Sequence, residues 1–163
     1  MRLMLQKATI GEKLLVNGDW VTNGRWMLRK DVLTPKDAAR FSTVDVAAGL
    51  LPGVDVRDIT TDTCKNVLRD EKECRPFEPT PWLHEYDGLT ARAYIDVSGE
   101  TENVAWIQEK YHQNVIDNGG FTVYGTDRNS SFLLKGGTDV VGVVMPVLGP
   151  DIASLPKLKG DPR

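Results

Sequence analysis

The sequence predicts an α+β protein built on an antiparallel sheet with about two helices, and three patterns predict this class. Two Asn-Gly pairs, at 17–18 and 23–24, separate short β-type segments near the N-terminus. A strictly alternating segment covers 89–97, and three short apolar segments near the C-terminus are separated by turn residues. Alternation with a period of two, interrupted by turn residues, is typical of antiparallel strands.

The N-terminal segment 13–30 is predicted to form a short β-meander. Asn-Gly tolerates the positive φ angles that type I′ hairpin turns require. In the last part of this segment, Trp26 and Leu28 alternate with three other residues, Arg25, Met27 and Arg29. The alternation predicts a strand with one apolar face and one basic face.

The middle of the chain gives weaker signals. A helix is predicted to start near Thr34, which can cap it, with Pro35 at the first helical position. Residues 42–62 are predicted to be irregular, with a short strand at 54–59. Residues 63–81 are polar and include three prolines, at 76, 79 and 81, so they predict a long exposed loop.

The C-terminal half is more regular. After the strand at 89–97, apolar residues at 104, 107, 111 and 115 have helical spacing and predict a helix over 104–116. Three strands are predicted to follow, at 121–124, 131–135 and 140–147. Because proline has no N–H to donate, the last of them should be buried up to Met145 and should stop at Pro146.

Length and composition fit one domain, which we place at 1–147, with a loose C-terminal tail at 148–163. The chain has 163 residues, of which 40% are hydrophobic and 26% charged. These values are close to those of average globular chains. No apolar run approaches the roughly 20 residues that span a bilayer. The N-terminus lacks the apolar core of a signal peptide, so we expect a cytoplasmic protein without membrane contact.

The charge is unevenly distributed along the chain. Residues 1–40 carry a net charge of +4, residues 41–118 carry −8, and residues 119–163 carry +1, within a total of −3. A basic N-terminal quarter can face a polyanion, whereas the acidic middle would be repelled by one. The simpler interpretation, which we favour, is that these charges keep the surface hydrated.

The two cysteines and two histidines do not have the spacing of a metal site. Cys64 and Cys74 are ten residues apart, and His84 and His112 each stand alone, whereas zinc sites use about four ligands in close pairs. We therefore expect no metal and no other cofactor. A cytoplasmic location favours reduced thiols over a disulfide, although the spacing allows one.

No motif of nucleotide binding or of a nucleophilic serine is present. One candidate binding surface is nevertheless suggested near the N-terminus, because cations interleaved with aromatic residues can hold single-stranded nucleic acid. Its residues are Lys13, Trp20, Arg25, Arg29 and Lys30. Core packing of the tryptophans is the alternative interpretation.

Several segments resemble the bacterial DNA sliding clamp, the processivity subunit of the replicative polymerase. Residues 21–29 resemble its strand–turn–strand pattern, with Asn23 where aspartate is usual. Residues 121–124, 130–134 and 143–147, which include Met145-Pro146, resemble its last three strands, and the predicted helix lies where the family has one. The resemblance covers about 60 residues and implies a clamp-like domain. The chain departs from the family in having about one domain instead of three and only Lys110 as a basic residue on that helix.

These observations favour a non-catalytic, clamp-like binding protein, an accessory of DNA replication or repair encoded by a phage or mobile element. It would act through protein partners, with a weak DNA contact at the N-terminal hairpin, and it could form oligomers. One alternative is an enzyme whose site assembles around His84, with Glu85 and Cys74. Another is a structural or inhibitory protein whose acidic middle mimics a polyanion.

Overall fold

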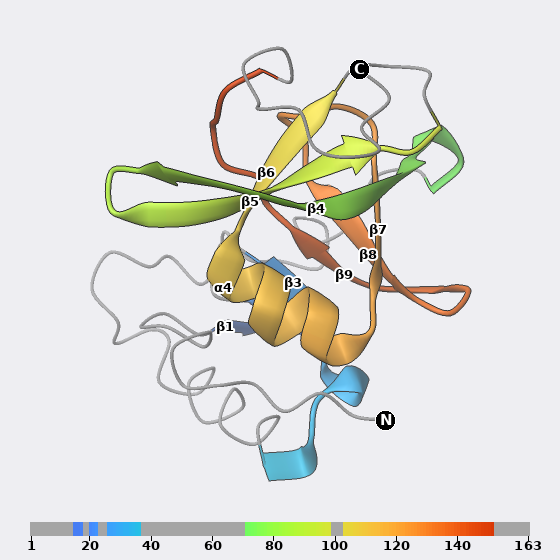
Figure 1. The fold of residues 1–163 in the computed structure, drawn as a ribbon. Helices are drawn as coiled ribbons and strands as arrows, with labels where there is room; N and C mark the ends of the chain where they lie inside the picture. The colour runs from blue at the N-terminus through green and yellow to red at the C-terminus, as the bar shows by residue number, and fades with distance from the viewer. Residues whose placement is uncertain (1–14, 18–19, 23–25, 37–70, 99–102, 152–163) are drawn as a thin grey trace.

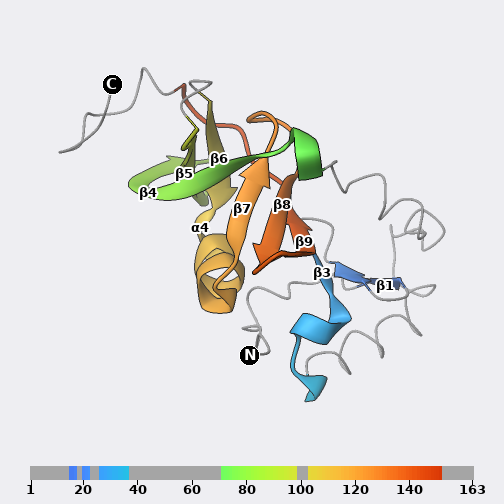
Figure 2. The same ribbon diagram turned by 90° about the vertical axis from the view of Figure 1, so that its right-hand side faces the viewer.

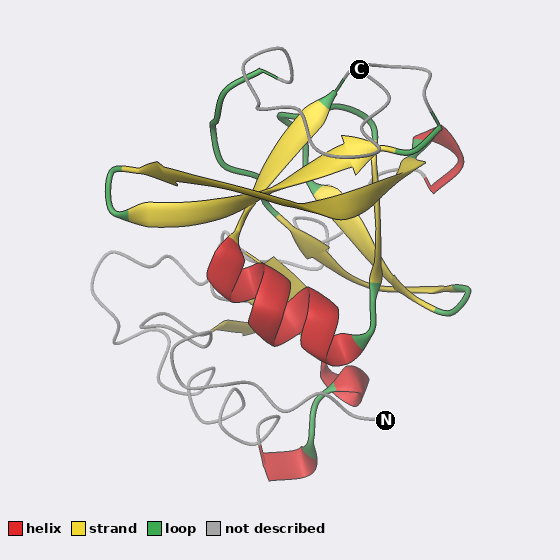
Figure 3. Cartoon of the chain, viewed as in Figure 1, coloured by secondary structure: helices red, strands yellow, loops and turns green. Residues whose placement is uncertain are grey.

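The computed structural model describes residues 15–17, 20–22, 26–36, 71–98 and 103–151 (Figure 1). Strands dominate these residues and form one antiparallel sheet, so the predicted α+β class is confirmed (Figure 3). The strands are β1 (Leu15–Asn17), β2 (Trp20–Thr22), β3 (Trp26–Arg29), β4 (Arg75–Tyr86), β5 (Leu89–Asp96), β6 (Val104–Gln108), β7 (Thr122–Gly125), β8 (Phe132–Gly136) and β9 (Asp139–Val144). The helical segments are η1 (Lys30–Val32), η4 (Glu71–Glu73), and α4 (Glu109–Tyr111) continuing into η5 (His112–Asp117).

The sheet curls so that the chain beyond β9 reaches the opposite edge. Its strand order is β1-β2-β3-β9-β8-β7-β4-β5-β6. Beyond β9, Val147 forms an antiparallel bridge with Trp106 of β6 and donates its N–H to the Trp106 carbonyl at 2.7 Å. The bridge closes strands β4 to β9 into a ring. Figure 2 shows β7, β8 and β9 side by side, with the α4–η5 helix below β4 and β5.

The residues after the bridge are held against Trp106. A Cβ on Gly149 would stand 2.3 Å from a carbon of the Trp106 ring, so only glycine allows this approach. The indole N–H donates to the Pro150 carbonyl at 2.9 Å, and Arg128 donates to the Gly149 carbonyl at 2.6 Å. These contacts hold Gly149 and Pro150, in the first part of the predicted tail, against the sheet. The later part of the predicted tail, 152–163, lies outside the described residues.

Strand β3 connects the N-terminal hairpin to the rest of the sheet. It pairs with β9, where Leu28 lies opposite Gly142. A Cβ on Gly142 would stand 2.5 Å from the carbonyl oxygen of Met27, so the missing side chain lets the two backbones approach. Trp26 and Leu28 pack into the main core, and Met27, only 5% exposed, packs into a separate cluster. Both faces of β3 are therefore buried, and the predicted basic face is wrong at Met27.

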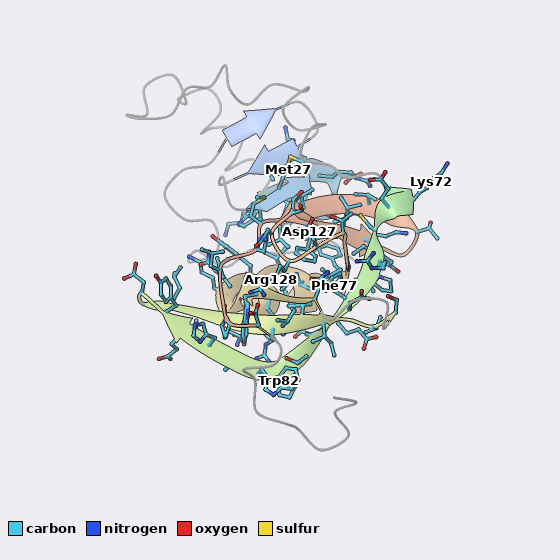
Figure 4. The ribbon with its side chains drawn as sticks, turned by 90° about the horizontal axis from the view of Figure 1, so that it is seen from above. Met27, Lys72, Phe77, Trp82, Asp127 and Arg128 are labelled. Carbon is cyan, nitrogen blue, oxygen red and sulfur yellow. The ribbon has the colours of Figure 1, made fainter. Side chains whose placement is uncertain are left out.

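The main core joins side chains of the sheet to side chains of the helix. Its largest buried side chains include Trp26, Tyr94 and Phe132, and burying each such side chain contributes about 1.5–3 kcal/mol. Phe77 packs edge-on against Phe132, with ring centroids 5.0 Å apart. Figure 4 shows Phe77 on the inner side of the β4–β5 hairpin and Trp82 on its outer side, where Trp82 belongs to a second cluster. The two faces of β4 therefore pack into two different hydrophobic clusters.

The segment predicted as a long loop over 63–81 is wrong for residues 75–81, which belong to β4. Proline is tolerated in strands at edges and bulges, and Pro81 lies inside the register shift between Pro79 and Leu83. The Thr80 hydroxyl donates to the Ala93 carbonyl at 2.9 Å and accepts the Trp82 N–H at 3.2 Å. The first of these bonds ties the bulge of β4 to β5.

The helix predicted over 104–116 is wrong in its first part. Residues 104–108 form β6, in which every residue is buried, and the helix begins only at Glu109. A strand buried on both faces is a continuous apolar run, which periodicity cannot distinguish from a buried helix. The helical spacing of Val104 and Ile107 with the later apolar residues was therefore misleading.

The other C-terminal predictions agree with the structure except at Met145, which is 37% exposed although burial was predicted up to this residue. Strands β5, β7, β8 and β9 lie where they were predicted, to within a few residues. Val143 and Val144 are 2% and 0% exposed, and β9 ends at Val144, just before Met145-Pro146. The helix predicted from Thr34 is described only at 35–36. Residues 37–70, with Cys64 and the strand predicted at 54–59, lie outside the described residues.

Candidate functional site

The structure describes only part of the predicted nucleic-acid surface. Lys13 and Arg25 lie outside the described residues. Trp20 of β2 is opposite Arg29 of β3 in the strand register, and Lys30 follows in η1. The Arg29 guanidinium donates to the Asp31 carboxylate at 2.8 and 3.0 Å, so Asp31 offsets its charge. Binding of DNA at this hairpin stays a prediction.

The residues of the enzyme alternative are not brought together. The His84 ring stacks on Tyr86 and lies 5.5 Å from the Trp106 ring, on the second cluster. Cys74 instead packs against the cluster that contains Met27. Ten residues of extended strand separate the two positions by roughly 30 Å. His84, Glu85 and Cys74 therefore do not form one site.

A different group of side chains assembles between β5 and the helix. Arg92 donates to both carboxylate oxygens of Glu109, at 2.7 and 2.6 Å, and also to the Thr80 carbonyl at 2.8 Å. Gln113 donates to the same carboxylate at 2.8 Å. Arg92 thus ties the bulge of β4 to the first turn of the helix. Its side chain is 20% exposed and that of Glu109 is 14% exposed.

The next residue on the same face of β5 is Tyr94, whose hydroxyl lies 2.5 Å from Nδ1 of His112. His112 begins and Asp117 ends the π-helical turn η5. The i→i+5 hydrogen bonds of a π-helix place its first and sixth residues on adjacent turns, and such turns are rare and frequent at functional sites. The wide turn therefore brings His112 and Asp117 to one side of the helix.

The electrostatics of this group favour one set of protonation states. Burial raises the pKa of Tyr94 above its ordinary value, although the charge of Arg92 opposes this. Burial lowers the pKa of His112, and the charge of Arg92 lowers it further. Burial alone would raise the pKa of Glu109, but hydrogen bonds from Arg92 and Gln113 outweigh burial and lower it. At neutral pH the tyrosine is protonated, the imidazole neutral and the carboxylate charged.

His112 and Asp117 separate two cavities. A polar cavity of about 530 Å³ lies beside Arg92 and Glu109, where the amide side chains of 113, 114 and 118 also line it. A cavity of about 390 Å³, which we call the apolar pocket, lies where β4 and β7 diverge. Its apolar walls include Phe77, Tyr94, Ile116, Phe121, Val123 and Tyr124. Glu78 and Thr122 also line this pocket, and both are exposed.

The arrangement suits recognition better than proton transfer. With Tyr94 protonated, its hydroxyl can donate to Nδ1 of neutral His112, and in that tautomer the ring proton is on Nε2. His112 can then donate a hydrogen bond to a ligand. In that tautomer the one lone pair of the ring accepts from Tyr94, and the Glu109 carboxylate accepts from Arg92 and Gln113. The site therefore presents a donor, a carboxylate at Asp117 and an apolar wall.

Sequence reasoning missed this site, although two of its signals were visible. Alternation places Arg92 and Tyr94 on one face of a strand, and Glu109 and His112 are three residues apart on a helix. What the sequence does not show is that this strand face meets this helix face. Among the described residues, no group of three His, Cys, Asp or Glu side chains is arranged as a metal site would be.

Comparison with protein-family models, with curated proteins and with solved structures finds no match to this chain. The sliding-clamp resemblance therefore rests on its sequence motifs alone and stays a prediction. In the part of the chain that the structure describes, no helix is both long and apolar enough to cross a membrane.

The lowered pKa of His112 predicts a pH-dependent stability. Between the ordinary histidine value of 6.5 and the lower pKa in the fold, the unfolded chain binds a proton that the folded chain does not. The free energy of unfolding should therefore fall as the pH is lowered below about 6.5. Glu109 does not contribute in this window, since its lowered pKa moves its titration further into acid.

Urea unfolding at pH 7.5, 6.5 and 5.5 measures this effect, with His112→Gln as the test variant and His84→Gln as the control. The loss of stability between pH 7.5 and 5.5 should shrink in His112→Gln and persist in His84→Gln. An unchanged loss in His112→Gln would show that His112 is not held neutral by the fold.

Proposed function

We propose that this chain is a non-catalytic binding protein that holds a segment of a partner protein in the apolar pocket. The pocket carries the proposal. Strands β4 and β7 pair only over 75–77 and 123–125, and beyond Phe77 the two strands diverge. The gap is lined by β5 through Tyr94 and by the helix through Ile116. An opening in an otherwise paired sheet, with an apolar lining, is suited to an apolar side chain.

The size and lining of the pocket support a side-chain ligand. Ligand pockets are typically about 300–1,000 Å³, with apolar walls and a few polar groups that fix orientation. The volume of about 390 Å³ is near the lower end of that range. Interfaces between proteins are commonly centred on an apolar or aromatic anchor that fills such a pocket. His112 and Asp117 would supply the polar contacts at the rim.

Strand addition is a less suitable binding mode here. A strand that adds to a sheet edge needs a row of backbone N–H donors and carbonyl acceptors. The stretch of β4 beyond Phe77 contains Pro79 and Pro81, which have no N–H to donate. Recognition through the side-chain pocket does not depend on these donors.

A non-catalytic role is supported by the chemistry of the site. A general base must offer a lone pair to the proton that it removes. In the tautomer in which Tyr94 donates to Nδ1, His112 has no lone pair left for a base, and Glu109 accepts from Arg92 and Gln113. The predicted accessory role in DNA replication or repair, the cytoplasmic location and the phage or mobile-element origin belong to this proposal.

Filling the pocket tests the proposal. Thr122 lies at the pocket and is exposed, so Thr122→Trp should place an indole in the pocket without disturbing the core. Thr138 is equally exposed in the β8–β9 turn, outside the pocket, and Thr138→Trp is the matched control. Peptides selected from a random display library on the parent protein should bind Thr122→Trp at least about tenfold more weakly and Thr138→Trp equally well.

Two outcomes would contradict the proposal. One is that repeated selection yields no peptide that binds the parent protein. The other is that the selected peptides bind Thr122→Trp as tightly as the parent, which would place the binding surface elsewhere.

A further inference from the structure

Resting on the proposed function, we infer that the segment held in the apolar pocket is basic, with an apolar side chain next to lysine or arginine. The inference comes from the charges around the pocket. Glu78 of β4 and Asp117 of η5 line it from two different elements, and both are exposed. Among the described residues, no lysine or arginine lines this pocket.

The nearest arginines of β4 and β5 are engaged elsewhere. Arg75 donates to the buried Asp96 carboxylate at 3.0 Å and to the Thr126 carbonyl at 2.9 Å. Arg92 donates to Glu109 and to the Thr80 carbonyl. Each guanidinium thus has a carboxylate partner of its own. Arg92 also attracts Asp117 electrostatically, but its hydrogen bonds go to Glu109 and Thr80. His112, which also lines the pocket, is neutral at pH 7 because burial and the charge of Arg92 lower its pKa.

An apolar pocket edged by two carboxylates selects its ligand by charge. A cationic residue next to the apolar anchor would gain attraction from both carboxylates, whereas an acidic segment would be repelled. Nucleic acid would meet the same repulsion from its phosphates. Asp117 also lines the polar cavity on the other side of His112, where Arg92 and Glu109 form an ion pair. A basic peptide segment of a partner protein is the occupant that this surface suits.

Charge reversal tests the inference separately from the proposed function. The test variant is Glu78→Lys/Asp117→Lys, and the matched control is Glu85→Lys/Asp139→Lys, which reverses two exposed carboxylates outside the pocket. Peptides whose binding is lost in Thr122→Trp should be enriched in Lys or Arg beside an apolar residue. Their affinity should fall at least about tenfold in the test variant, stay near the parent value in the control, and weaken as salt is raised.

A charge swap completes the test. Replacing the cation of a selected peptide by glutamate should abolish binding to the parent and restore binding to Glu78→Lys/Asp117→Lys. If Thr122→Trp blocks binding but the selected peptides show no enrichment in cations and bind the test variant normally, the inference is overturned and the proposed function stands. If Thr122→Trp has no effect, both are overturned.

Two other occupants would also overturn the inference. Sedimentation could show a dimer of the parent that Glu78→Lys/Asp117→Lys dissociates, which would identify a second copy as the occupant. A labelled oligonucleotide could bind the parent but not Thr122→Trp, which would identify nucleic acid. We expect neither, and a parent that is monomeric and does not bind the oligonucleotide through the pocket agrees with a basic peptide ligand.

Discussion

Replacing Gly142 by alanine is expected to destabilise the protein by about 3 kcal/mol, the upper part of the range for overpacked sites. The added Cβ would stand 2.5 Å from the Met27 carbonyl oxygen and 2.7 Å from a methyl carbon of Leu28. The first of these atoms belongs to the backbone, so β3 and β9 must separate to relieve the contact. The N-terminal hairpin joins the rest of the sheet through this strand pair.

Urea unfolding measures the effect, with Gly136→Ala as the matched control. A Cβ on Gly136, in the neighbouring strand β8, would meet its nearest atom at 3.4 Å, an ordinary contact. This control should change stability by less than about 0.5 kcal/mol. Equal stability of the Gly142→Ala and Gly136→Ala proteins would contradict the close β3–β9 approach.

Replacing Arg92 by methionine is expected to cost about 2–3 kcal/mol. Removing one partner of a buried ion pair typically costs about 3–5 kcal/mol, and the partial exposure of Arg92 and Glu109 reduces this. The variant would leave the Glu109 carboxylate with Gln113 as its remaining side-chain donor among the described residues. It would also remove the donor to the Thr80 carbonyl at the β4 bulge.

A double-mutant cycle separates the ion pair from packing. Arg92→Met/Glu109→Met should be more stable than Arg92→Met alone, because no buried charge is left behind. The exposed ion pair between Arg29 and Asp31 provides the comparison. The Asp31 side chain is 63% exposed, so Arg29→Met should cost at most about 1 kcal/mol. If the stability losses of Arg92→Met and Glu109→Met add up to the loss of the double variant, the two residues are not coupled.

The sequence predicts those parts of the fold in which one strand face is exposed or a turn is marked by glycine. The alternation from Leu89 onward gave β5, and the glycines at 136 and 137 marked the β8–β9 turn correctly. The failures have physical causes. Pro79 and Pro81 led to a loop prediction for part of β4, because a β-bulge tolerates prolines that a regular strand ladder excludes. Burial on both faces removed the alternation from β6.

The candidate site depends on a contact that local patterns cannot predict. Tyr94 and His112 are 18 residues apart, and the ion pair between Arg92 and Glu109 spans 17. Both contacts require the helix to pack under the β4–β5 hairpin, which follows from the curl of the sheet (Figure 1). The π-helical turn that brings Asp117 beside His112 has no distinctive sequence signal. The sequence shows each of these residues, but it does not show that they are in contact.

Binding of a partner segment in the apolar pocket is tested most directly by amide chemical-shift mapping. The labelled protein is titrated with the tightest peptide whose binding Thr122→Trp abolishes. The largest shifts should fall on the pocket residues Phe77, Thr122, Val123 and Tyr124 and on His112 of the helix. The tip of the β4–β5 hairpin is another exposed apolar surface, with Leu83, Tyr86 and Leu89 exposed by 53%, 66% and 41%. Shifts confined to that tip, with the pocket unchanged, would contradict the proposed function.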